Sequence, residues 1–335
     1  MSPFPIIEIH AESHEEFGYL LGKAIKKKIQ IIVKKVLADA AKRNKITIKE
    51  ILRRTDLYLP YAQRYFPQYV QEIRGIAKGA NVSFEKIWAI NIEEIVFDDF
   101  LEHCSTIVQK EGNGFTVFHN EDFEPIFKKH TVILKGSIKK TSFISLVFAG
   151  LVPGSSVSRN NFGLIQAIDS VHPKLTLTGI PKNILARAIL EAETIEEAIH
   201  ILNHPARASG YNHILLQGNK AVNIETSSTK VNVQEIKNVF IHTNHYLLGL
   251  KDRYPMPLSK ERYKQLTKGM QNKIQSREKI IELLSAHKNP PICHHNLKDG
   301  ITIASLAAST NNQTLLITSG NPCTNKYLPY SFIKE

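Results

Sequence analysis

Cys104 and Asp122 are the residues in this chain whose types and positions most directly suggest chemistry. Residues 105–109 and 115–119 are rich in β-branched and aromatic side chains, and an Asn-Gly step lies between the two runs. That arrangement is a strong signal for a β-hairpin. Antiparallel pairing brings the end of the second strand beside the start of the first. The sequence therefore predicts that the thiol of Cys104 and the carboxylate of Asp122 are neighbours.

A cysteine nucleophile needs a nearby base and a hydrogen-bond donor for the oxyanion that forms on its substrate. Asn244 is the candidate donor, because it lies in the sequence His-Thr-Asn-His at the end of a predicted strand. Each residue has a simpler explanation: Cys104 as a small buried hydrophobic residue, and Asn244 as a turn residue. The hairpin brings polar residues, including Asn120 and Asp122, close to Cys104. Their presence favours the catalytic interpretation.

Metal binding is the other chemistry that 14 histidines suggest. The candidate ligands are His242, His245, Cys293, His294 and His295. Neighbouring residues diverge in any regular element, and residues three apart in a strand face opposite sides, so none of these sets matches a zinc spacing. No phosphate-binding glycine loop is present either. We therefore expect no metal and no cofactor.

The composition is that of a globular protein, with 42% hydrophobic and 22% charged residues in a chain of 335. No apolar stretch reaches the ~18 residues of a membrane-spanning helix. Residues 1–12 lack the features of a secretory signal, so we expect a cytoplasmic protein. The net charge is +12, but the lysines between residues 23 and 45 alternate with apolar residues and are interpreted as a solvated helix face rather than a nucleic-acid site. Three cysteines without a Cys-x-x-Cys pair argue against a disulfide framework.

The hydrophobic pattern divides the chain into a helical first part and a strand-rich second part. Residues 14–42 are predicted to form one long amphipathic helix, and helical patterns continue to residue 100. Further helices are predicted at 184–191, 195–202, 258–268 and 276–287. Strands are predicted at 131–134, 142–148, 162–168, 213–217, 221–226, 239–243, 302–307 and 314–318. Runs of strands flanked by helices indicate a layered α+β sandwich with largely antiparallel sheets.

Several motifs occur in an order that resembles the isopenicillin N acyltransferase-like family of cysteine N-terminal nucleophile (Ntn) hydrolases. They are Cys104-Ser-Thr, Asn120-x-Asp122-Phe, Ser209-Gly-Tyr211-Asn212, Glu225-Thr and His242-Thr-Asn244-His, with Glu16-Phe-Gly18-x-x-x-Gly22 and Asn160-x-x-Gly163 before or between them. The resemblance implies a four-layer αββα sandwich. It also implies a single domain over residues 1–335, in which a helical segment, 1–103, precedes a catalytic segment, 104–335.

The resemblance further implies a precursor that cuts itself between His103 and Cys104. Cys104 matches the nucleophile, Asp122 the family's aspartate and Asn244 its oxyanion asparagine. Once freed, the α-amino group of Cys104 has a reference pKa of about 7.7 to 8.0 and can act as the base for its own thiol. Asn120, Asp169, Tyr211 and Asn212 are expected to line the site.

This chain also departs from the family pattern. A histidine, His103, stands where the family member of penicillin synthesis has glycine before its nucleophile. No arginine occurs between residues 300 and 308, where that member uses one, and Asp169 stands in place of an amide.

The leading expectation is an autoproteolytic cysteine hydrolase or acyltransferase that acts on a small amide or acyl donor through a thioester on Cys104. A coenzyme A thioester is a candidate substrate, and the two fragments are expected to stay associated after cleavage. The alternatives are a hydrolase only, acting on a small linear amide, and a basic binding protein on the same scaffold that never processes. No nucleic-acid partner is expected.

Overall fold

The structure is a computed structural model that describes residues 3–97, 104–295 and 300–332. Its strands form two sheets. The first has eight strands in the order β1-β4-β5-β6-β7-β8-β9-β10, and the second has six in the order β11-β2-β3-β12-β13-β14. Every neighbouring pair is antiparallel except β1 and β4, which are parallel.

The eight-stranded sheet consists of β1 (Ile6–Ala11), β4 (Thr131–Ile138), β5 (Thr141–Phe148), β6 (Ser158–Asn160), β7 (Ile165–Asp169), β8 (Asn212–Gln217), β9 (Lys220–Thr226) and β10 (Val231–Glu235). The six-stranded sheet consists of β2 (Ser105–Glu111), β3 (Gly114–Phe123), β11 (Val239–His242), β12 (Ile301–Ser309), β13 (Leu315–Ile317) and β14 (Leu328–Tyr330).

The helices before the hairpin are α1 (His14–Ala24), α2 (Lys26–Asn44), α3 (Ile48–Asp56), α4 (Leu59–Tyr65), α5 (Pro67–Ala80), α6 (Phe84–Ile90) and α7 (Glu93–Val96). Those after it are the short 3-10 helix η1 (Pro125–Lys129), α8 (Lys182–Ile189), α9 (Ile195–Leu202), α10 (Pro257–Met270) and α11 (Arg277–Leu284).

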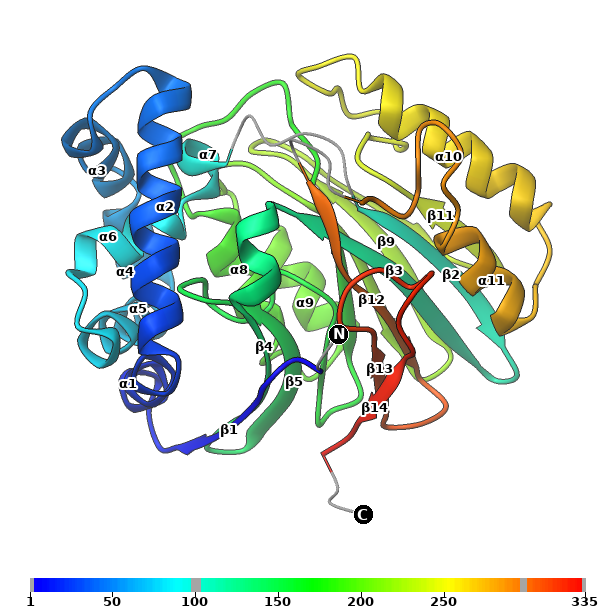
Figure 1. The fold of residues 1–335 in the computed structure, drawn as a ribbon, viewed down its shortest axis with the longest axis horizontal. Helices are drawn as coiled ribbons and strands as arrows, with labels where there is room; N and C mark the ends of the chain where they lie inside the picture. Colours follow the sequence, from blue (N-terminus) through cyan, green and yellow to red (C-terminus); the bar gives the residue numbers. More distant parts are fainter. Residues whose placement is uncertain (1–2, 98–103, 296–299, 333–335) are drawn as a thin grey trace.

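The two sheets pack face to face and helices cover both outer sides (Figure 1). Strands β2 and β3 contact β7, β8 and β9 across the interface between the sheets. Helix α9 packs against β8 on one outer side, where the N-terminal helices also lie, and α10 and α11 pack against β11 and β3 on the other. The predicted αββα sandwich with largely antiparallel sheets is therefore confirmed.

The N-terminal part differs from the prediction in two places. The sequence predicted that the segment before the first strand is helical throughout. Residues 6–11 instead form strand β1, which pairs with β4 at the edge of the large sheet. The predicted single helix over 14–42 is two helices separated at Ile25, whose φ of −118° and ψ of 27° lie outside the helical region. Both features depend on packing against distant residues, which a hydrophobic period does not report.

Gly18 and Gly22, from the motif near the N-terminus, allow α1 to lie directly against α5. A Cβ at Gly18 would come within 2.0 Å of the carbonyl oxygen of Glu72, and one at Gly22 within 2.3 Å of that of Ile76. Gly75 and Gly79 of α5 face the backbone of α1 at similarly short distances. The motif thus serves close helix packing.

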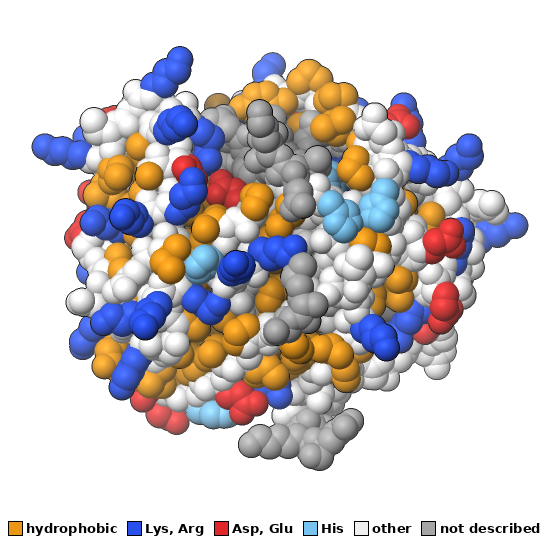
Figure 2. Space-filling view, viewed as in Figure 1, with side chains coloured by type: hydrophobic (Ala, Val, Ile, Leu, Met, Phe, Trp, Pro, Cys, Tyr) orange, Lys and Arg blue, Asp and Glu red, His pale blue; other side chains and the backbone are white. Residues whose placement is uncertain are grey.

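Helix α2 has the predicted amphipathic character, with Ile29, Ile32 and Val33 buried and its lysines largely exposed. On the face drawn in Figure 2, Lys and Arg side chains are scattered among hydrophobic and polar ones instead of forming one continuous patch. Among the residues that the structure describes, no helix combines the length and apolar character needed to cross a membrane.

Candidate active site

The hairpin that positions Cys104 is formed by β2 and β3. Ser105 pairs with Asn120 and Thr106 with His119, so the polar cluster of β3 lies beside the start of β2, as predicted. Two residues, Gly112 and Asn113, make the turn, because Glu111 pairs with Gly114. Gly112 has a positive φ of 59°, which glycine adopts without strain. The turn is therefore centred one residue earlier than the Asn-Gly step suggested.

Cys104 is buried immediately before the first residue of β2, and its Sγ lies 4.0 Å from Oε1 of Glu121. Burial raises the pKa of the thiol well above its ordinary value, and the charges of Glu121, Asp169 and Asp122 raise it further. In the intact chain the thiol is thus protonated, so any attack by its sulfur requires a base. His103, on the other side of the predicted cleavage bond, lies outside the described residues.

Arg262 of α10 links Cys104 to Asn244. It is fully buried, and its Nη1 donates to the carbonyl oxygen of Cys104 at 2.6 Å and to Oγ of Ser105 at 2.7 Å. Its Nη2 donates to Oδ1 of Asn244 at 2.7 Å. The Nδ2 of Asn244 donates to the carbonyl oxygen of Ser170 at 3.0 Å. The guanidinium of Arg262 can only donate hydrogen bonds, so the side-chain atom of Asn244 that it contacts must be the amide oxygen.

The turn that carries Asn244 is held by a second residue of the same helix. Ser259 lies one helical turn before Arg262, and its Oγ accepts a hydrogen bond from the backbone N–H of Asn244 at 2.7 Å. The same oxygen lies 2.8 Å from Nδ1 of His245. Helix α10 therefore orients both the backbone and the side chain of Asn244.

Asp122 is buried near the C-terminal end of β3, which lies beside the start of β2. Its Oδ2 lies 3.7 Å from Nε2 of His294. Burial raises the pKa of its carboxyl group to about 7, although Thr302 and the positive charge of Arg262 act in the opposite direction. A positive charge placed beside Asp122 would lower this pKa.

Cys104, Glu121, Asp122 and Asn244 all line one narrow pocket with a volume of about 40 Å³. Phe97, Phe123, Phe148, Leu151 and Ile168 supply its apolar lining, and Glu93, Lys182, His172, Tyr211, Ser155 and Ser170 its remaining polar lining. Thus the thiol, both neighbouring carboxylates and the asparagine share one cavity.

Behind the pocket, a chain of buried polar groups joins the two sheets. Oγ1 of Thr106 donates to Oδ1 of Asp169 at 2.8 Å and lies 2.8 Å from Nδ1 of His119. Nε2 of His119 lies 3.3 Å from Oε2 of Glu121. Although burial opposes it, the hydrogen bond to Glu121 and the surrounding carboxylates raise the pKa of His119. This series of hydrogen bonds ends at the Glu121 carboxylate, beside the Cys104 thiol.

The same chain continues away from the pocket through His242. Its Nδ1 lies 3.1 Å from Oδ2 of Asp169 and its Nε2 3.7 Å from Oε1 of Glu225. Despite burial, these two carboxylates raise the pKa of His242 to about 9. A cationic His242 keeps Asp169 and Glu225 from being uncompensated buried charges.

The four residues expected to line the site lie in different places. Tyr211 lines the pocket, and its hydroxyl donates to Oδ1 of Asn183 at 2.8 Å. Asp169 and Asn212 lie behind it in the buried polar chain, where Nδ2 of Asn212 is 3.4 Å from Oδ2 of Asp169. Asn120 faces the α11 side of the sheet and donates to the carbonyl oxygens of Leu284 and Ile292.

Other motif residues support the scaffold. Oδ1 of Asn160 accepts hydrogen bonds from the backbone of Phe162 and Leu164 across a turn in which Gly163 has a positive φ of 81°. Oε2 of Glu225 accepts the backbone N–H of Leu248 at 2.9 Å, which holds the segment after Asn244.

Two residues of the site, Arg262 and Glu121, were not identified from the sequence. Arg262 shares the buried stripe of α10 with Ser259, Leu266 and Met270. An arginine in an apolar stripe was the available signal, since charged residues are rarely buried without a partner. Glu121 belongs to the polar cluster of β3, but residue order alone does not tell which member of that cluster faces the thiol.

Atoms of Cys104, His119 and Glu121 lie within 4.8 Å of one another and are close enough to share a metal ion. Both ring nitrogens of His119 already have partners, however, in Thr106 and Glu121. The geometry therefore favours a hydrogen-bonded thiol site over a metal centre at this position.

Comparison with known proteins identifies a family. The family model described as AAT, acyl-coenzyme A:6-aminopenicillanic acid acyl-transferase, matches residues 109–324. The matched range includes Asp122, Asn244 and Arg262 and begins after Cys104.

Two curated relatives are similar to this chain. The beta-alanyl-dopamine/carcinine hydrolase of Drosophila melanogaster is 26% identical over 215 residues, which span 57% of this chain and 55% of the relative. The 40 kDa form of acyl-coenzyme A:6-aminopenicillanic-acid-acyltransferase from Emericella nidulans is 25% identical over 263 residues, which span 74% and 72%. The match thus covers only about half the length of the Drosophila protein.

Solved structures also resemble this chain. A conjugated bile acid hydrolase from Clostridium perfringens has 12% identity and a TM-score of 0.46, with 69% of this chain and 97% of that one covered. Penicillin V acylase from Agrobacterium tumefaciens has 10% identity and a TM-score of 0.46, with 68% and 86% covered.

Proposed function

Because the chain belongs to the acyl-coenzyme A:6-aminopenicillanic acid acyl-transferase family, we propose that it is a cysteine enzyme acting on a small amide or acyl thioester through a thioester on Cys104. The observation that carries the proposal is the pocket shared by the Cys104 thiol, Asp122 and an Asn244 held by Arg262. A nucleophile, a charge partner and an amide donor in one cavity are what acyl transfer requires.

The enzyme first cuts its own chain before Cys104. The thiol attacks the carbonyl carbon of His103, and the bond from that carbon to the nitrogen of Cys104 breaks as this nitrogen takes up a proton. The resulting thioester is hydrolysed by water, which releases the His103 carboxylate and the free thiol. Glu121 is the base for this first attack, a role supported by its 4.0 Å distance from Sγ.

The new α-amino group of Cys104 then serves as the base for the thiol during turnover. Its reference pKa of about 7.7 to 8.0 suits proton transfer near neutral pH. Asp122 stabilises the ammonium form, in accord with its position in the same buried pocket. Nδ2 of Asn244 donates to the oxyanion of the tetrahedral intermediate, and its second hydrogen remains bonded to Ser170.

The substrate class follows from the two kinds of wall in the pocket. Phe97, Phe123 and Phe148 suit an apolar or aromatic group, whereas Glu93 and Lys182, paired at 3.2 Å, suit a polar end. The Drosophila relative is named for the hydrolysis of beta-alanyl-dopamine and carcinine, which agrees with this class.

Acyl transfer is the second candidate, and it is favoured by the family match and by the fungal relative, which is named for transfer from coenzyme A. A coenzyme A thioester would then form the acyl-enzyme, and an amine would replace water as the acceptor. Measuring product from both acceptors after acylation with one donor separates the two activities.

The deciding experiment compares purified wild-type protein with Cys104→Ala by intact mass under denaturing conditions. Wild type should appear as two fragments, the second beginning at Cys104, and Cys104→Ala should remain one chain. Cleavage of Cys104→Ala at the same bond would overturn self-processing. A wild-type chain that stays intact and turns over no amide or thioester would instead favour the basic binding protein.

A further inference from the structure

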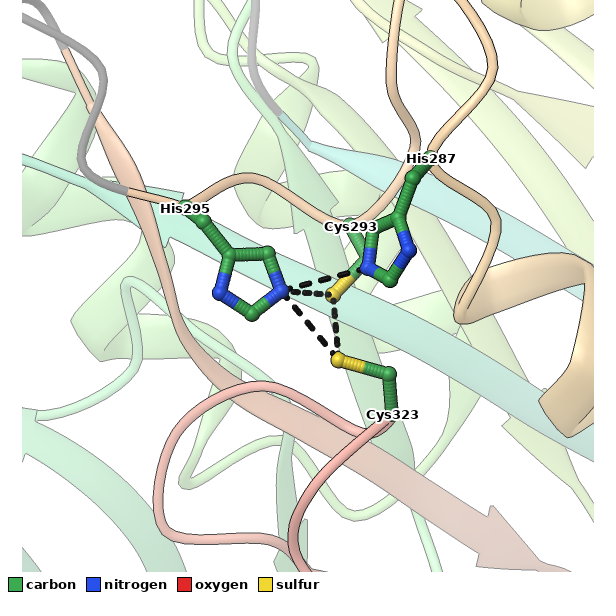
Figure 3. A group of neighbouring side chains, drawn as sticks. All are labelled: His287, Cys293, His295 and Cys323. Atoms are coloured by element: carbon green, nitrogen blue, oxygen red, sulfur yellow. Dashed lines mark hydrogen bonds between the residues drawn. The ribbon is translucent and has the colours of Figure 1, made fainter.

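We propose that His287, Cys293, His295 and Cys323 bind one Zn²⁺ ion at a structural site beside the active site. The first three come from the loop between α11 and β12, and Cys323 comes from the loop between β13 and β14 (Figure 3). One ligand atom from each residue lies within 4.8 Å of all the others. The figure shows both imidazole rings and both thiols directed toward a common point.

The spacing of these atoms matches a tetrahedral zinc site. With Zn–S near 2.3 Å and Zn–N near 2.05 Å, a tetrahedron has edges of about 3.8 Å between sulfurs, about 3.6 Å between sulfur and nitrogen, and about 3.3 Å between nitrogens. The two sulfurs lie 3.6 Å apart and the two Nε2 atoms 3.2 Å apart. Nε2 of His295 lies 3.6 Å from Sγ of Cys293 and 3.2 Å from Sγ of Cys323. Four of the six edges can thus be compared, and each agrees within about 0.4 Å. The other two, from Nε2 of His287 to the sulfurs, are no longer than 4.8 Å.

The ligand types select zinc among the common metals. Two thiolates and two imidazoles form the Cys₂His₂ set of structural zinc sites, whereas magnesium and calcium prefer oxygen ligands. All four positions of the tetrahedron are filled by side chains, as in a structural site rather than a catalytic one. His287 and His295 are exposed, so the ion can enter from solvent.

A hydrogen-bond donor outside the four ligands supports the thiolate. Nδ2 of Asn321 lies 3.3 Å from Sγ of Cys293 and donates to the carbonyl oxygen of His294 at 2.6 Å. Such outer contacts orient the ligands of metal sites. Asn321 precedes Cys323 by two residues, so one loop supplies both the ligand and its support.

A disulfide between Cys293 and Cys323 is the competing explanation. Both cysteines are free thiols, and their sulfurs at 3.6 Å are well beyond the bond length of about 2.05 Å. A disulfide would also leave unexplained why two histidines converge on the same point.

The site has a defined relation to the active site through His294. Neighbouring residues diverge, as expected from the sequence, so His295 faces the four-residue cluster while His294 faces Asp122 at 3.7 Å. The backbone of His294 is bonded to Thr302, which pairs with Asp122 across β12 and β3. Zinc bound by Cys293 and His295 would therefore hold His294 in place beside Asp122.

This proposal revises the expectation that the chain has no metal site. His242 and His245 take no part, because His242 belongs to the buried polar chain and His245 contacts Ser259. The sequence did not identify two of the ligands, His287 and Cys323. Their separations from Cys293 and His295 along the chain match no short zinc motif.

The test uses the Cys104→Ala chain, in which Cys293 and Cys323 are the only cysteines. The protein is purified under reducing conditions, and its zinc content is measured by mass spectrometry. It is then stripped with chelator and titrated with Co²⁺, whose sulfur-to-metal charge-transfer absorption reports thiolate ligation. We expect one metal ion per chain and two titratable thiols after the metal is removed.

Variants in this background locate the site. His295→Ala and Cys323→Ala should lower the affinity for Co²⁺ by at least tenfold, whereas the adjacent His294→Ala should retain one ion per chain with the same absorption. Circular dichroism checks that each variant is folded.

Two outcomes would overturn the proposal. One is failure of the reduced Cys104→Ala chain to bind Zn²⁺ or Co²⁺, including the case in which both thiols are already lost to a disulfide. The other is loss of the ion in a folded His294→Ala chain but not in His295→Ala. Neither result depends on enzymatic activity, so the proposed function is tested separately.

Discussion

At the scale of single residues, Asn244 contributes its two ends to different tasks. Its oxygen accepts from Arg262 and its nitrogen faces the carbonyl oxygen of Ser170 and the pocket. Truncation to alanine would remove one of the acceptors of the buried Arg262, which mixes a stability effect with a catalytic one. A substitution that keeps the acceptor separates the two.

Asn244→Asp should lower the single-turnover acylation rate of the cleaved enzyme by about 10²-fold to 10³-fold, because it removes the oxyanion donor and keeps the oxygen that Arg262 binds. The midpoint temperature of thermal unfolding should stay close to that of wild type. Asn161→Asp is the matched control, since Asn161 is an exposed asparagine that bonds Ser142 and Lys140 in a turn. An acylation rate per folded molecule equal to wild type would limit Asn244 to a turn role.

The raised pKa of Asp122 makes stability depend on pH. The unfolded chain releases this proton near pH 4, whereas the folded chain retains it until about pH 7. The folded state therefore binds more protons in that interval, so stability falls as pH rises from about 4 to about 7.

Comparing Cys104→Ala with Cys104→Ala/Asp122→Asn measures this effect without the charge of a new N-terminus. The single variant should lose up to about 1.4 kcal/mol of unfolding free energy per pH unit relative to the double variant across that interval. Urea unfolding at several pH values provides the measurement. A difference that does not vary with pH would mean that Asp122 ionises at its ordinary pKa in the folded chain.

At the scale of elements, the contact between α1 and α5 depends on four glycines. A Cβ on Gly75 would lie 2.1 Å from the carbonyl oxygen of Glu15, and backbone cannot move aside as a side chain can. A Cβ on Gly269 of α10 would lie 2.3 Å from Cδ2 of Leu283, a contact that rotation of one side chain relieves.

Gly75→Ala should therefore destabilise the chain by about 1–3 kcal/mol, the usual cost of overpacking. Gly269→Ala should cost less, because alanine favours a helix over glycine by up to about 1 kcal/mol and offsets the contact. Urea unfolding of both variants in the Cys104→Ala background tests this. Equal losses would show that the backbone contact between α1 and α5 costs no more to relieve than the side-chain contact at Gly269.

At the scale of the whole molecule, residues before and after Cys104 build one structure. Strand β1 pairs with β4, and the rings of Phe17 and Phe143 lie 5.7 Å apart. Nη2 of Arg187 lies 2.8 Å from Oε2 of Glu72, and both side chains are fully buried. The main hydrophobic core includes residues from both parts. We propose that residues 1–335 form a single domain.

Cleavage before Cys104 should consequently leave the two fragments associated. The cut protein should elute from a sizing column at the same volume as uncut Cys104→Ala, with both fragments in one peak, and separate only in denaturant. Buried ion pairs and a shared sheet cannot be exposed without a large cost, which is the reason for this expectation. Elution of a free N-terminal fragment under native conditions would contradict it.

The sequence by itself determined the features that arise from local order. Alternating apolar residues around a turn predicted the hairpin of β2 and β3, and therefore the proximity of Cys104 to Asp122. The helical and strand periods also predicted most elements and the antiparallel layers, since each period reports which face of an element is buried.

Tertiary structure decided what depends on contacts between distant segments. Arg262 reaches Cys104 and Asn244 only because α10 packs against β11, which pairs with β2. Cys323 reaches Cys293 and His295 only because two loops meet. No spacing along the chain encodes such contacts, because they are set by how layers and loops pack. The same reason explains why β1 and the break at Ile25 were not predicted.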